Sequence, residues 1–137
     1  MVERDTELHR FLHEEIGSEE ALDVLVFLFR NREQWWSAGE VRDRLRIAGD
    51  ATGAMSAIAS KRVELRMTHL QQKQLLITNS ESRTFRYKAE KKMTLMVETL
   101  AALNESELTD VARLIYLRPR GAAEAFAEAF APRRPRS

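Results

Sequence analysis

The sequence contains no cysteine and few residues that interrupt regular structure. Of its 137 residues, only five are glycine and three are proline. Without cysteine the chain can form neither a disulfide framework nor a thiolate metal site. A chain of this length can still bury a core of its own. We therefore expect one folded domain stabilised by packing.

Long apolar runs are also missing. The longest, Val24 to Phe29, is far shorter than the ~20 residues that a membrane-spanning helix needs. The first five residues are too charged for a secretory signal peptide. With 44% hydrophobic and 31% charged residues, the composition is ordinary for a soluble protein. We expect a cytoplasmic protein with no membrane partner.

Motifs for catalysis are absent as well. There is no glycine-rich phosphate loop, no cysteine nucleophile and no elbow-type serine motif. His9 and His13 are four residues apart beside Glu14, a spacing that can place two imidazoles on one metal. No third ligand is recognisable, so a solvated helix face is the favoured interpretation. His69 is interpreted as a structural or surface residue. We predict no enzyme activity, no metal and no cofactor.

The charges are unevenly distributed although the net charge is only +1. Acidic residues dominate positions 1–24, and basic residues dominate positions 56–92. Most single charges on helices are simply solvated. A separation of this kind can nevertheless give a locally positive surface that attracts nucleic acid.

The apolar spacing predicts helices at the start of the chain. Residues 1–17 form an acidic helix that Gly17 ends, and Ser18 caps the next helix. That second helix is apolar on almost every side, so we expect it at the centre of the core. Ser37 and Glu40 form a capping box for a third helix.

The middle of the chain is less regular. Residues 47–59 give no clear pattern, and a helix is predicted from residue 60 to about 73. Residues 75–78 and 83–87 are typical of two strands joined by a polar turn, which predicts a short β-hairpin. A pair of strands this short is stable only when it packs on helices.

Further helices are predicted after the hairpin. One covers residues 90–104, with Met93 and Met96 as core positions, and another follows residue 104. The alanine-rich segment 122–131 is grouped with these helices, and the Pro/Arg-rich residues 132–137 are predicted to be disordered.

Three segments carry a resemblance to a known family. They are the capped helix start (Trp36-Ser37-Ala38-Gly39-Glu40-Val41), the run Leu70-Gln71-Gln72-Lys73-Gln74-Leu75-Leu76-Ile77 and the strand Phe85-Arg86-Tyr87. By these segments the chain resembles the winged helix-turn-helix superfamily, especially the small bacterial regulators of the MarR and PadR groups. The resemblance implies a mainly α fold with a two- or three-stranded antiparallel β-hairpin wing.

The resemblance also implies a division of the chain. It gives an N-terminal acidic helix at 1–17, a winged helix-turn-helix domain at 18–89 and a helical extension at 90–131. Two features depart from the family. Leu45 and Leu75 are further apart than usual, and Gln74 stands where these families have glycine, a position that favours left-handed backbone.

The function implied is that of a transcriptional regulator bound to double-stranded DNA. Its third helix would lie in the major groove and its wing on the backbone. The basic and hydroxyl side chains of that helix would contact bases or phosphates, and those of the hairpin would contact phosphates. The expected contacts are Ser56, Ser60, Lys61, Arg62, Arg66, Arg83, Arg86 and Lys88.

The C-terminal apolar stripes predict a homodimer, which would present two reading heads on one site. The expected interface residues are Leu108, Val111, Leu114, Ile115, Phe126 and Phe130. The other interpretation is that these residues cover the core of their own chain. The aromatic residues able to line an effector pocket are interpreted as core packing instead. These are Trp35, Trp36, Phe85 and Tyr116.

A second function stays open, because winged helices also act as protein-interaction modules. The chain would then be an adaptor or an antagonist of a transcription component. A continuous basic surface over the third helix and the wing favours DNA. An apolar or acidic surface there favours a protein partner.

Overall fold

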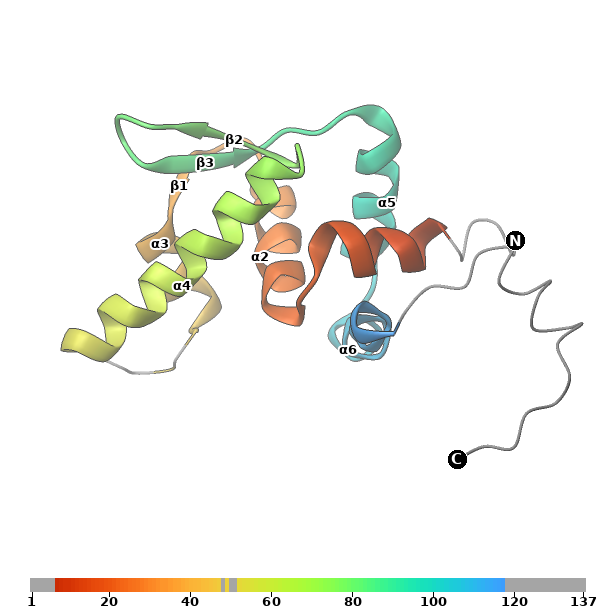
Figure 1. The fold of residues 1–137 in the computed structure, drawn as a ribbon, viewed down its shortest axis with the longest axis horizontal. Coiled ribbons are helices and arrows are strands. Elements are labelled where there is room, and N and C mark those ends of the chain that lie inside the picture. The colour runs from red at the N-terminus through yellow and green to blue at the C-terminus, as the bar shows by residue number, and fades with distance from the viewer. Residues whose placement is uncertain (1–6, 48, 50–51, 118–137) are drawn as a thin grey trace, which may run out of the picture.

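The structure is a computed structural model that describes residues 7–47, 49 and 52–117 (Figure 1). Helices dominate it, with one small antiparallel sheet, so the coarse class predicted from the sequence is confirmed. None of the described helices is long and apolar enough to cross a membrane. The elements are η1 (Phe11–Ile16), α2 (Glu19–Arg30), β1 (Trp36–Ser37), α3 (Ala38–Leu45), α4 (Gly53–Gln72), β2 (Leu76–Asn79), β3 (Thr84–Tyr87), α5 (Lys91–Ala101), α6 (Glu105–Ala112) and η2 (Arg113–Tyr116).

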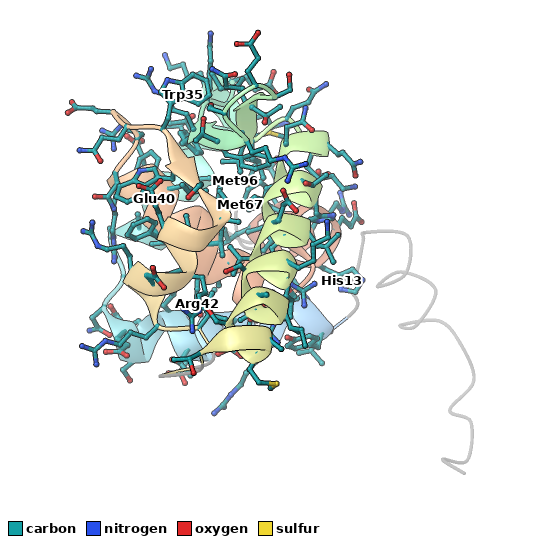
Figure 2. All side chains as sticks on the ribbon, turned by 90° about the vertical axis from the view of Figure 1, so that its left-hand side faces the viewer. His13, Trp35, Glu40, Arg42, Met67 and Met96 are labelled. Carbon is teal, nitrogen blue, oxygen red and sulfur yellow. The ribbon has the colours of Figure 1, made fainter. Side chains whose placement is uncertain are left out.

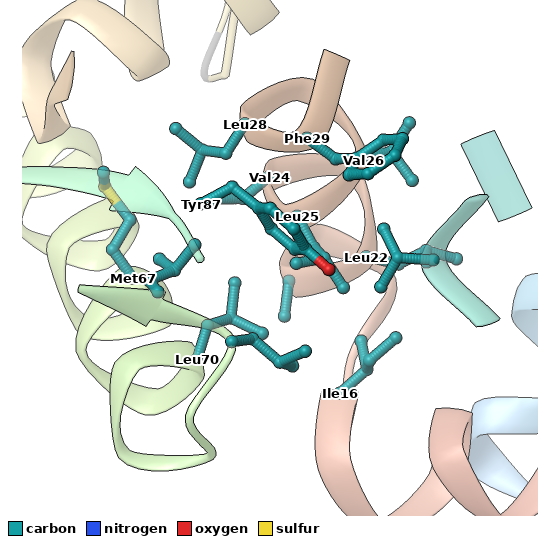
Figure 3. Close-up of a cluster of buried hydrophobic side chains, with 14 of the residues drawn as sticks. Ile16, Leu22, Val24, Leu25, Val26, Leu28, Phe29, Met67, Leu70 and Tyr87 are labelled. Carbon is teal, nitrogen blue, oxygen red and sulfur yellow. The ribbon is translucent and has the colours of Figure 1, made fainter. Parts of the chain in front are cut away.

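Helix α2 is the centre of the core, as its apolar sequence predicts. Ser18 caps it by accepting a hydrogen bond from the backbone N–H of Ala21, 3.1 Å away. Leu22, Leu25 and Leu28 are completely buried. Side chains from α4 and β3 close around the helix, among them Met67 and Tyr87 (Figure 3). This burial fixes the position of α4 against α2.

The sheet has three strands in the order β1–β3–β2, both pairs antiparallel. Trp36 of β1 pairs with Phe85 of β3, and Leu76 of β2 pairs with Tyr87. The hairpin predicted from the turn chemistry is therefore present. Its third strand, β1, comes from residues that lie directly before α3. The sheet thus joins the start of α3 to the hairpin that follows α4.

Helix α3 begins at the predicted capping box. The Ser37 hydroxyl accepts from the backbone N–H of Glu40 at 3.2 Å, and the Glu40 carboxylate accepts from the backbone N–H of Ser37 at 2.9 Å. Two orphan amides at the helix start are satisfied in this way.

Several predicted bounds were wrong. Helix α4 begins at Gly53 rather than at residue 60, and α5 ends at Ala101 rather than at 104. The first helix changes at Phe11 to the wider π form, which ends at Gly17, a residue in left-handed conformation (φ 81°). Residues 1–6 of that predicted helix lie outside the described residues, as do the segment 122–131 and the tail 132–137.

Candidate nucleic-acid interface

Helices α3 and α4 and the β2–β3 hairpin lie together on one face of the molecule. Figure 1 shows them on the side opposite α5 and α6, and Figure 2 looks onto this face, with α3 and α4 side by side. The 20-residue α4 packs through one side on α2 and α3. Its other side is turned outward, and most of the predicted contacts lie on this helix or at the hairpin.

The predicted contacts on α4 differ in exposure. Because the helix begins at Gly53, Ser60 and Lys61 lie in its middle turns and not at its exposed start, where the sequence had predicted them. Ser56 and Ser60 are half-buried, on the same side of the helix as the buried Ala59 and Val63. Lys61 faces outward with 70% of its side chain exposed, and its Nζ lies 3.2 Å from the Glu64 carboxylate. An exposed i,i+3 pair of this kind is weak, so Lys61 remains available to a phosphate.

The two arginines of the predicted set share one acidic partner. Arg62 donates through Nε to both carboxylate oxygens of Glu20, at 2.9 and 3.1 Å. Arg66 donates through its own Nε to Oε1 of Glu20, at 3.2 Å. Glu20 lies in the first turn of α2, so both arginines lean from α4 toward α2.

This contact keeps Glu20 ionised. Partial burial alone raises the pKa of the carboxyl group, but the hydrogen bonds and charges of Arg62 and Arg66 outweigh that effect. The pKa of Glu20 therefore lies below its ordinary value. The contact between one carboxylate and two guanidinium groups persists at neutral pH.

The remaining predicted cations lie in or directly after the β2–β3 hairpin. Arg83 is exposed at the turn and has a positive φ of 55°. Lys88 is exposed just after β3. Arg86 is half-buried, and its Nε donates to the backbone oxygen of Arg32 at 2.9 Å. Arg83 and Lys88 are thus the freer cations of the hairpin.

An apolar strip on α4 was missed from the sequence. Met55, Ile58 and Leu65 are 62%, 59% and 59% exposed, and Ile58 and Leu65 are two turns apart. Their spacing of three and seven residues was the available signal. Two of the three residues, Met55 and Ile58, lie in the segment 47–59, whose sequence gives no clear helical pattern. The outward face of α4 is therefore partly apolar and partly basic.

All three histidines donate to backbone carbonyl groups, as the structural role interpreted for His69 requires. His9 and His13 are half-buried, so they are not on a fully solvated helix face. His9 and His13 donate to the carbonyl oxygens of Leu117 and Ile115, at 2.8 and 2.7 Å. His69 donates to the carbonyl oxygen of Glu15 at 2.9 Å. Within the described ranges, no group of three or more His, Asp or Glu side chains has the geometry to hold a metal ion.

The residues predicted to form a dimer interface pack on their own chain where the structure describes them. Ile115 is 2% exposed, and the other three are half-buried against the same core. The three are Leu108, Val111 and Leu114. Phe126 and Phe130 lie outside the described residues. The described residues of this set therefore cover the core of their own chain, which is the alternative to the dimer interface given by the sequence.

The four aromatic residues are divided between core and surface. Trp36 and Phe85 are buried, as their interpretation as core residues predicts. Trp35 is 40% exposed and Tyr116 63% exposed, so for these two that interpretation was wrong. The Tyr116 hydroxyl accepts from the backbone N–H of Glu19 at 3.2 Å.

Comparison with protein-family models, curated proteins and solved structures finds no match for this chain.

Proposed function

We propose that the protein is a DNA-binding regulator of the winged-helix type. Helix α4 would enter the major groove, and the β2–β3 hairpin would lie on the adjacent backbone. The observation that carries the proposal is the common face of α3, α4 and the hairpin. The strand order β1–β3–β2 links these three elements at that face.

The charges on this face support the same function. Lys61 on α4 and Arg83 at the turn of the hairpin are exposed, and both belong to the segments that would meet DNA. Cations contact phosphates and release counterions, which gives affinity that falls as salt rises. The protein then regulates transcription by occupying a site in the duplex.

The first experiment is a fluorescence-anisotropy titration against random-sequence duplex DNA at low and high salt. We expect binding that weakens steeply with salt. The Lys61→Ala/Arg83→Ala variant should bind more weakly, with the slope of log K against log salt reduced by ~1 for each lost phosphate contact.

A matched control separates local contacts from net charge. The Lys91→Ala/Lys92→Ala variant removes the same charge from the start of α5, on the opposite side from the proposed interface. It should leave both affinity and slope nearly unchanged. No binding by the wild-type protein at low salt contradicts the DNA function.

A protein-interaction module is the second candidate, and the apolar strip of α4 favours it. Burying an apolar side chain is worth ~1.5–3 kcal/mol, so Met55, Ile58 and Leu65 offer substantial energy to a partner. A partner for this strip would carry apolar side chains, with an acidic one facing Lys61.

A photo-crosslinking residue at position 65 distinguishes the two functions. The DNA function expects adducts with duplex DNA, because position 65 lies on the outward face of α4. The second function expects an adduct with a single protein, and expects the Ile58→Ser substitution to abolish it. The two classes of adduct are readily separated by nuclease treatment before electrophoresis.

A further inference from the structure

Two arginines of the proposed interface are already engaged by an acid. Arg62 and Arg66 are 44% and 39% exposed, whereas their shared partner Glu20 is only 22% exposed. Both arginines use Nε for this contact. Among the described residues, no hydrogen-bond partner is found for the Nη groups of either arginine.

The geometry points to Glu20 as a positioning residue that restricts the binding of Arg62 and Arg66 to DNA phosphates. The inference rests on the proposed DNA function. A phosphate and a carboxylate compete for the same guanidinium donors. A duplex therefore has to draw the arginines away from Glu20, or bind them only through their Nη groups.

The electrostatic consequence is a weaker non-specific attraction. One carboxylate shared by two guanidinium groups cancels about half of their charge at this place on the surface. Non-specific binding depends on such charges, whereas base readout depends on the other outward side chains of α4. Glu20 thereby limits binding to arbitrary DNA sequences.

The test is the Glu20→Gln variant in the same anisotropy titration with random-sequence duplex. Glutamine keeps the size and an acceptor oxygen but removes the charge. We expect affinity at low salt to rise roughly fivefold, since both guanidinium groups become free to bind phosphates. The salt slope should steepen by ~0.9 for each added phosphate contact.

Two controls identify the contact as the cause. Glu19→Gln makes the same charge change at the neighbouring exposed residue, which has no ion pair in the described part of the chain. It should alter affinity less than about twofold. In the Arg62→Ala/Arg66→Ala background, Glu20→Gln should no longer raise affinity, because the groups it releases are absent.

The outcomes separate this inference from the proposed function. The inference is overturned, and the DNA function stands, if the wild type binds DNA and Glu20→Gln does not bind it more tightly. The same holds if the affinity of Glu20→Gln rises no more than that of Glu19→Gln. If only Glu20→Gln binds, the inference that Glu20 restricts the arginines is supported, and the DNA function of the wild-type protein is contradicted. If neither protein binds at low salt while both are folded by circular dichroism, both are overturned.

Discussion

Gln74 holds a backbone conformation that its side chain disfavours. It connects α4 to β2 with φ 66°, and its backbone N–H donates to the carbonyl oxygen of Gln71 at 3.0 Å. A residue with a Cβ pays ~1–2 kcal/mol for left-handed backbone, whereas glycine does not. The families that the sequence resembles have glycine at this position, and that resemblance predicts the left-handed conformation found here.

We expect Gln74→Gly to raise the free energy of unfolding by ~0.5–1 kcal/mol. The relief of strain exceeds the entropy that glycine loses on folding. Urea denaturation measures the change. Gln72→Gly, in the last turn of α4, is the control and should lower stability by a similar ~0.5–1 kcal/mol. A loss of stability in both variants would contradict the strain argument.

Contacts between side chains that are far apart in the sequence could not be predicted from the sequence, unlike the backbone conformation of Gln74. The sequence identified Arg62 and Arg66 as exposed cations, which they are in part. Their partner Glu20 lies 42 and 46 residues earlier in the chain. The three side chains meet because α2 packs against α4. Local sequence patterns do not indicate which helices pack together, so this contact could not be predicted from them.

At the scale of elements, the capping box at the start of α3 makes a contribution to stability that can be measured directly. Ser37→Ala removes the hydroxyl that accepts from Glu40 N–H. We expect a loss of ~1 kcal/mol in the free energy of unfolding, because an amide at the helix start loses its partner. Thermal unfolding followed by circular dichroism measures it. Ser37→Asp, which can also cap, should retain most of the stability, and equal losses for both would exclude capping as the cause.

Elements with short-range signals were predictable from the sequence, and one without them was not. The capping box, the hairpin turn and the apolar stripe of α2 each involve neighbours within about four residues. The start of α4 lacks a buried apolar stripe of this kind, because residues 53–55, 57 and 58 are exposed. The spacing of its apolar residues Met55 and Ile58 belongs to an outward face, so it does not mark a helix that packs on the core.

At the scale of the whole molecule, α2 links the other elements into one core. It packs against η1, α3, α4, β3 and α5. We therefore expect one cooperative unfolding transition. Leu25→Ala should lower the free energy of unfolding by ~3 kcal/mol, since Leu25 is completely buried. Urea curves from far-ultraviolet circular dichroism and from tryptophan fluorescence should coincide.

Leu95→Ala is the matched control for this prediction. Leu95 on α5 is 55% exposed, so its loss should cost less than ~1 kcal/mol. Equal effects of the two substitutions would contradict the assignment of α2 as the centre of the core. Separate transitions for the two optical probes would show that the core unfolds in parts.

The projecting start of α4 has a consequence for how the protein meets a partner. Its N-cap residue Thr52 makes no side-chain capping bond, and the first turn is exposed to solvent. Local opening of these turns therefore costs much less free energy than global unfolding. This first turn can open without disturbing α2, and a partner that orders it gives up part of its binding energy to do so. A partner that binds tightly at this end would then show a large, unfavourable entropy of binding. A partner that binds weakly there would dissociate rapidly.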